Sequence, residues 1–286
     1  MPELKIVECP RDAMQGIHEF IPTEIKTSYI NQLLNCGFDT IDFGSFVSPK
    51  AIPQMRDTAE VLNGLQLTGN SSKLLAIVAN ERGATDAASF DEIHYLGYPF
   101  SISEQFQQRN TNTSIEDSLH NLESIQSIAQ KAKKELVVYL SMGFGNPYGE
   151  EWNTDLVLSW SERLHNNVGI SILALSDTIG CANPEDVRSL FPQLTQALPN
   201  VEFGAHFHTV REKANGIIAA AYEGGCRRFD TAIKGFGGCP MAKDDLTGNL
   251  ATEQLLAWMK EQQIETGINM DLFQTAFLAS NAVFNL

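Results

Sequence analysis

The segment ISILALSDTIGCANPEDVRSLFPQLTQALPNVEFGAHFH, residues 170–208, contains a complete strand–helix–strand unit. Short apolar runs at 170–177 and 201–208 predict buried strands. Between them, residues 183–198 have apolar positions at helical spacing. Pro184 falls in the first helical turn, where its missing N–H is harmless. A helical crossover joins parallel strands, so the two strands are predicted to be neighbours in one parallel sheet.

The same unit recurs along the whole chain of 286 residues. The other predicted strands cover 5–10, 40–46, 73–80, 92–100, 135–142 and 227–235. The other predicted helices cover 23–37, 53–65, 84–90, 114–134, 153–169, 210–225, 247–262 and 271–284. Eight strand–helix units predict a closed parallel barrel, the (β/α)₈ or TIM barrel, with an extra C-terminal helix. No linker or composition shift interrupts residues 1–286, so we expect a single domain.

The composition of the chain indicates which kinds of partner and which cellular location to expect. The formal net charge is −15, and no basic stripe offsets it, so nucleic acid is not expected as a partner. No run of 18 apolar residues predicts a membrane span, and the N-terminus has no signal-like segment. The five cysteines are widely spaced, without a CxxC pair, which argues against a disulfide framework or zinc ribbon. A cytoplasmic location is therefore expected.

The motif HFH places two imidazoles at the end of the predicted strand 201–208. Side chains in a strand alternate between faces, so His206 and His208 are expected to point the same way. A lone histidine in a barrel is most often a packed core residue. Two on one face, near an acidic residue, favour a divalent cation, Mg²⁺ or Mn²⁺, with Zn²⁺ as a further candidate.

Arg11 and Asp12 follow the first predicted strand, and TIM-barrel sites are built at such carboxyl ends. The pair could simply cap a surface loop. The functional interpretation is that Asp12 ligates the cation, while Arg11 presents a fixed charged fork to a carboxylate or an oxyanion.

The glycine-rich stretch GFGGCPMAKDDLTGN, residues 235–249, predicts a mobile loop after the last strand. Cys239 on this loop could donate or accept a proton, although most cysteines are simply buried. Asn249 can offer an amide oxygen to a cation, and Lys50 and Lys243 could meet phosphates. The remaining cysteines, at positions 9, 36, 181 and 226, are expected to have packing roles.

Together these motifs resemble those of the 3-hydroxy-3-methylglutaryl-CoA lyases, of the DRE-TIM metallolyase superfamily. ECPRDAMQ (8–15) is similar to that family's PRDGLQ, and SFVSPKAIPQM (45–55) to its SFVSPK-x-x-PQM. DTIG (177–180), HFH (206–208), GGCP (237–240) and TGNLATE (247–253) follow in the family's order. The resemblance covers nearly the whole chain, and the last two motifs distinguish the lyases from related condensing synthases.

The resemblance implies a retro-Claisen cleavage that gives acetoacetate and acetyl-CoA, as in leucine catabolism and ketone-body formation. It implies an acyl-CoA substrate, a divalent cation and a homodimer. The implied metal ligands are Asp12, His206, His208 and Asn249. The residues implied to take part in catalysis are Arg11, Cys239, His206, Asp42 and Asp177. The residues implied to bind substrate are Arg11, Gln15, Ser45, Lys50 and Lys243.

This sequence departs from the family pattern at a few positions. Asp42 stands where the family has Glu, and Thr209–Val210 where it usually has Asp-Thr. The loop through residues 243–246 is one residue longer. These differences leave the acyl group open. The alternatives are a related metal-dependent aldolase acting on a 4-hydroxy-2-oxo acid, an acyl-CoA condensing enzyme, and a non-catalytic acyl-CoA-binding barrel.

Overall fold

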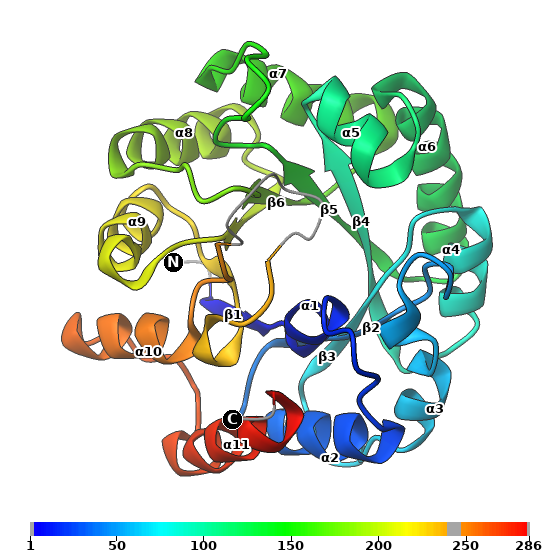
Figure 1. Ribbon diagram of the computed structural model, residues 1–286. Coiled ribbons are helices and arrows are strands. Elements are labelled where there is room, and N and C mark those ends of the chain that lie inside the picture. The colour runs from blue at the N-terminus through cyan, green and yellow to red at the C-terminus, as the bar shows by residue number, and fades with distance from the viewer. Residues whose placement is uncertain (1–2, 239–246, 285–286) are drawn as a thin grey trace.

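A closed barrel of eight parallel strands forms the centre of the molecule, as predicted (Figure 1). The computed structural model describes residues 3–238 and 247–284. Each strand pairs with the next in sequence, and β1 pairs with β8 to close the barrel. The strands are β1 (Lys5–Glu8), β2 (Thr40–Ser45), β3 (Lys73–Ile77), β4 (Ile93–Ser101), β5 (Glu135–Ser141), β6 (Ile172–Asp177), β7 (Glu202–Phe207) and β8 (Arg228–Thr231).

The helices form a ring around the barrel (Figure 1). They are α2 (Thr23–Leu34), η1 (Pro53–Met55), α3 (Thr58–Asn63), α4 (Glu81–Ala88), α6 (Ile115–Lys131), α7 (Thr154–Arg163), η2 (Leu164–Val168), α8 (Pro184–Ala197), α9 (Arg211–Glu223), η3 (Ile233–Gly235), α10 (Thr252–Glu261) and the extra helix α11 (Met270–Phe284). The short helix η3 was not expected, because it falls within the strand predicted over 227–235, which ends at Thr231. Two further helices were also not expected, α1 (Pro10–Gln15) and α5 (Glu104–Thr111). Across the described residues, no helix combines the length and apolar character needed to cross a membrane.

Several differences from the predicted boundaries fall near the candidate site. The strand predicted over 5–10 ends at Glu8, because Pro10 opens α1 and carries no N–H for a ladder. The helix predicted over 53–65 is divided into η1 and α3. The helix predicted from 247 begins at Thr252, because the preceding residues are extended and bridge to the barrel. One of these bridges joins Asn249 to His208.

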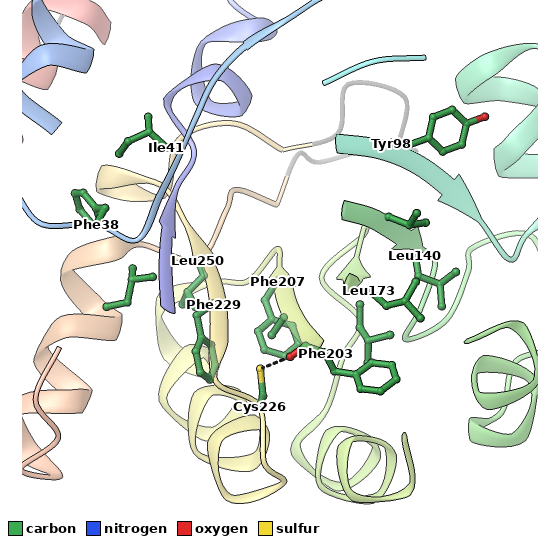
Figure 2. Close-up of a cluster of buried hydrophobic side chains, with 14 of the residues drawn as sticks. Phe38, Ile41, Tyr98, Leu140, Leu173, Phe203, Phe207, Cys226, Phe229 and Leu250 are labelled. Atoms are coloured by element: carbon green, nitrogen blue, oxygen red, sulfur yellow. Dashed lines mark hydrogen bonds between the residues drawn. The ribbon is translucent and has the colours of Figure 1, made fainter. Parts of the chain in front are cut away.

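Both faces of the strands are buried, as the near-continuous apolar runs require. Outward-facing side chains pack under the helices, and Figure 2 shows part of this layer around Phe203, Phe207 and Phe229. The inward-facing cluster fills the barrel itself and consists of Leu75, Ile77, Tyr95, Val137, Tyr139, Ile172 and Ala174. The polar residues at the carboxyl ends of the strands lie directly above this inner cluster.

One buried carboxylate ties the first strand to the end of the chain. Glu8 is fully buried, and its Oε1 accepts the backbone N–H of Ile233 at 2.8 Å. Its Oε2 accepts the hydroxyl of Thr252 at 2.6 Å. Burial raises the pKa of Glu8 to about 8, against the opposing effect of these two hydrogen bonds. Glu8 therefore joins β1 to η3 and to the start of α10.

Glu8 should make the stability of the protein fall with rising pH. The folded carboxyl has a pKa of about 8, whereas the ordinary value is 4.5, so the folded state holds its proton more tightly. The resulting stability is fully present below the ordinary value and is lost as pH rises through the folded pKa. The slope should be on the order of 1.4 kcal/mol per pH unit between these values. Urea unfolding at several pH values measures it.

Glu8→Gln, which cannot ionise, should flatten this profile. The surface variant Glu60→Gln is the matched control and should keep the slope of the parent protein. If Glu8→Gln and the parent protein gave parallel profiles, Glu8 would be ionised in the folded state at all these pH values, contrary to this expectation.

Candidate metal centre

Asp12, His206 and His208 meet at the carboxyl end of the barrel. Asp12 is held by α1 directly after β1, His206 is the penultimate residue of β7, and His208 lies just beyond that strand. One ligand atom from each lies within 4.8 Å of the others. The two imidazole centroids are 5.3 Å apart, which confirms that both rings face the same side. The three residues thus form a compact group of donors suited to one cation.

The surroundings of His208 keep it in the form that binds metals. Its Nδ1–H donates to the carbonyl oxygen of Thr178 at 3.0 Å, which leaves a lone pair on Nε2. That Nε2 is buried and has no hydrogen-bond partner among the described residues. Burial, assisted by the neighbouring His206, lowers the pKa of His208 to about 4. A neutral imidazole with an unpartnered buried nitrogen fits a metal ligand.

Asp12 is ionised and surrounded by donors. Burial alone would raise the pKa of Asp12. Its electrostatic interactions with Arg11, His206 and His208 outweigh burial, so the pKa is lowered from its ordinary value. Its Oδ1 accepts Arg11 Nη1 at 3.0 Å and Gln15 Nε2 at 2.7 Å. Its Oδ2 accepts Asn249 Nδ2 at 2.7 Å. Because Asn249 uses its amide nitrogen here, its amide oxygen is the atom left for a cation.

Arg11 is held as a fixed fork beside this group. Its Nε donates to both oxygens of Asp42, at 3.1 and 3.0 Å, and its Nη2 also donates to that carboxylate. Burial raises the pKa of Asp42 to about 6, although Arg11 opposes the shift. Burial acts to lower the pKa of Arg11, but Asp42 and Asp12 raise it overall. The guanidinium therefore stays charged and keeps one orientation.

A cavity of about 250 Å³ opens above these residues. Arg11, Asp12, both histidines and the predicted substrate-binding residues Gln15 and Ser45 line it. Its wall towards β2–β4 and α5 is mainly apolar and includes Val47, Ile52 and Phe106. A partly apolar cavity with a few polar groups at one end is typical of a small-molecule site.

Other predicted site residues lie elsewhere. Lys50 is exposed on the loop after β2 and does not line this cavity. Asp177 is buried, and its carboxylate accepts the backbone N–H groups of Cys181 and Ala182, both at 2.9 Å. It therefore shapes the loop whose Thr178 carbonyl orients His208. Cys239 and Lys243 lie outside the described residues.

Two residues at the site were missed in the sequence. Tyr139 on β5 packs edge-on against His206 at a centroid distance of 5.4 Å, and its buried hydroxyl has no hydrogen-bond partner among the described residues. Asp230 on β8 lies 3.2 Å from His206 Nδ1 through its Oδ2. Burial alone would lower the pKa of His206. The hydrogen bond and the charge of Asp230 outweigh burial, so the pKa of His206 is raised from its ordinary value. The available signal for Asp230 was that it is the one acidic residue of the predicted strand 227–235.

A TIM barrel with an Asp–His–His cluster and a held arginine at its carboxyl end defines a class of barrel proteins with a candidate divalent-metal centre. Within that class, the chain belongs to the HMGL-like family, whose model matches residues 4–278.

Individual relatives agree with this assignment. The chain is 36% identical to the hydroxymethylglutaryl-CoA lyase YngG of Bacillus subtilis, over 93% of this chain and 88% of that protein. It is 34% identical to the cytoplasmic 3-hydroxy-3-methylglutaryl-CoA lyase of Rattus norvegicus, over 94% of this chain and 78% of that protein. An HMG-CoA lyase from Acinetobacter baumannii, solved with coenzyme A and 3-methylmalate, superimposes with a TM-score of 0.90 at 31% identity. That match covers 99% of this chain and 92% of that one.

Proposed function

We propose that this protein is a divalent-metal-dependent lyase that cleaves 3-hydroxy-3-methylglutaryl-CoA to acetyl-CoA and acetoacetate. The family and its relatives support the reaction class. The observation that carries the proposal is the buried Nε2 of His208, which has no partner within the described part of the chain and lies with Asp12 and His206 beside the fixed guanidinium of Arg11. The Asp12–His206–His208 group offers oxygen and imidazole donors and contains no cysteine, which favours Mg²⁺ or Mn²⁺, with Zn²⁺ as a further candidate.

Each residue of the candidate site is proposed to have a separate role in the reaction. A bound divalent cation would supply Lewis acidity to the hydroxyl and carbonyl oxygens of the substrate. A base in the cavity takes the proton of the C3 hydroxyl, the C2–C3 bond breaks, and the electron pair of that bond passes to the thioester as an enolate. Arg11, held by Asp42, stabilises the enolate oxygen. Cys239 returns a proton to the enolate carbon. Asp177 supports the site by holding the loop behind His208.

The acyl-CoA is proposed to enter over the cavity. Gln15 and Ser45 line it and can bind the acyl portion, while Lys50 and Lys243 would bind phosphates outside it. The relative from Acinetobacter baumannii, solved with coenzyme A, supports this class of substrate. We further propose a homodimer and a cytoplasmic location.

Product analysis tests the proposal. The purified protein with Mg²⁺ should convert 3-hydroxy-3-methylglutaryl-CoA to equal amounts of acetoacetate and acetyl-CoA, measured by mass spectrometry. Cys181→Ala, which changes an exposed thiol, should give the parental rate. No cleavage of this thioester, together with pyruvate formation from a 4-hydroxy-2-oxo acid, would identify an aldolase instead. Binding of the thioester without turnover would identify a non-catalytic barrel.

The carboxyl transferase domain of Rhizobium etli pyruvate carboxylase is similar at a TM-score of 0.72 but only 14% identity. That similarity concerns the fold alone and lends no support to a different reaction.

A further inference from the structure

A buried carboxylate lies directly beside the candidate metal ligands, on the inner face of the barrel. Asp230 is paired in register with His206 across β7 and β8, and its Oδ2 lies 3.2 Å from His206 Nδ1. The residue is 2% exposed. Its second oxygen, Oδ1, is also buried and has no hydrogen-bond partner among the described residues. Asp230 is therefore the group that decides which nitrogen of His206 faces the cavity.

A buried arginine occupies the layer below. Arg228 precedes Asp230 by two residues on β8, so both side chains point into the barrel. It is 1% exposed, and its Nη1 lies 3.3 Å from Glu202 Oε1 at the base. Its Nε and Nη2 have no partner within the described part of the chain. Burial acts to lower the pKa of Arg228, but Asp230 and Tyr139 raise it overall, so the guanidinium remains charged.

The neighbouring strand leaves room for this arginine. Gly204 on β7 is the register partner of Arg228. A Cβ atom at Gly204 would lie 3.1 Å from Cδ and 3.3 Å from Cγ of Arg228. An apolar pair would fill this layer without the cost of desolvating a charge. The sequence instead has a glycine on β7 and buries the guanidinium of Arg228 on β8, which indicates a role for that positive charge.

We propose that Asp230 and Arg228 are positioning residues for His206. Asp230 accepts the Nδ1–H of His206 and so directs the lone pair of Nε2 towards Asp12 and His208. Arg228, two residues earlier on β8, places a fixed positive charge in the layer below the Asp230 carboxylate. The inference rests on the metal site of the proposed function, and it adds two residues outside the Asp12–His206–His208 group. Carboxylate partners of this kind fix the tautomer of metal-binding histidines.

Mn²⁺ binding to the full chain without any thioester tests the inference, with free Mn²⁺ followed by electron paramagnetic resonance. Asp230→Asn should weaken Mn²⁺ binding about 10–100-fold. In the metal-free protein labelled with ¹⁵N-histidine, the same variant should move His206 towards the Nε2–H tautomer. A residue with a merely structural role would leave that tautomer unchanged.

Arg228→Met separates two effects of opposite sign. If Arg228 acts through Asp230, its loss should weaken Mn²⁺ binding about tenfold, in the manner of a lost outer-shell partner. If it acts only as a distant positive charge, its loss should tighten binding. Arg228→Lys retains the charge and should bind within about threefold of the parent protein. It serves as the deciding variant if Arg228→Met does not fold.

Glu202→Gln is the matched control, because it removes the partner of Arg228 at the base and leaves Asp230 intact. It should bind Mn²⁺ like the parent protein, and circular dichroism checks the fold of each variant. Parental Mn²⁺ affinity and an unchanged His206 tautomer in folded Asp230→Asn would overturn the inference. Failure of the parent protein itself to bind Mn²⁺ would overturn the metal site of the proposed function instead.

Discussion

Exhaustive chelation should abolish cleavage of 3-hydroxy-3-methylglutaryl-CoA, and Mg²⁺ or Mn²⁺ should restore it. Asp12 is ionised, His208 is neutral, and both direct their free atoms into one group, so the ligands are prepared for a divalent cation. Without that charge, the substrate oxygens would face the carboxylate of Asp12, which Arg11 opposes among the described residues that line the cavity. The loss should exceed 1000-fold, in keeping with several kcal/mol of Lewis-acid stabilisation.

The measurement combines an acetoacetate assay with elemental analysis before and after treatment with EDTA. Asp12→Asn removes one ligand charge and should raise the Mn²⁺ concentration needed for half-maximal activity. Glu60→Gln, on the exposed surface of α3, should leave it unchanged. Full turnover by a protein in which no metal can be detected would disprove the metal-dependent reaction.

Arg11→Lys should lower turnover by about 100-fold or more and change substrate affinity much less. Arg11 donates through three nitrogens at once, to Asp42, Asp12 and Gln15. A lysine ammonium keeps the charge but has one nitrogen and no planar fork, so it cannot span all three partners. The charge would then no longer be fixed where the enolate oxygen develops.

Steady-state kinetics of Arg11→Lys, with separate values of kcat and KM, provide the measurement. Arg56→Lys is the matched control, because Arg56 is exposed, stacks on Phe20 and does not line the cavity. It should leave kcat within about twofold. A rise in KM at constant kcat in Arg11→Lys would assign the residue to ground-state binding and remove its role in the reaction.

The barrel could be predicted because its periodic signal is strong and repeated. Each strand is buried on both faces and each long helix has its own apolar stripe, so the alternation is visible without any tertiary information. The short helices α1 and α5 were missed because they lack such a periodic signal. α1 has six residues, too few to show a period, and α5 contains mostly polar residues between Glu104 and Thr111.

The candidate site could be predicted as far as it depends on chain order. Asp12, His206 and His208 are next to strand ends, and barrel topology alone brings those ends together. The partners that orient them were not predictable in the same way. Asp230 contacts His206 only because β7 and β8 pair in one particular register, and Thr178 contributes a backbone carbonyl that any residue could supply.

Closure of the barrel between β1 and β8 has a consequence for how the protein is made. Lys5 pairs with Arg228, and Glu8 with Thr231, so the two ends of the sheet are separated by most of the chain. During synthesis on a ribosome, Asp12 emerges long before His206, His208 and Asn249, and it has no ligand partners until β7 and the segment before α10 have emerged. Contacts of such high sequence separation form late and slowly. The candidate cation site is therefore assembled at the end of folding, and an incompletely translated chain lacks the ligands to hold a cation there.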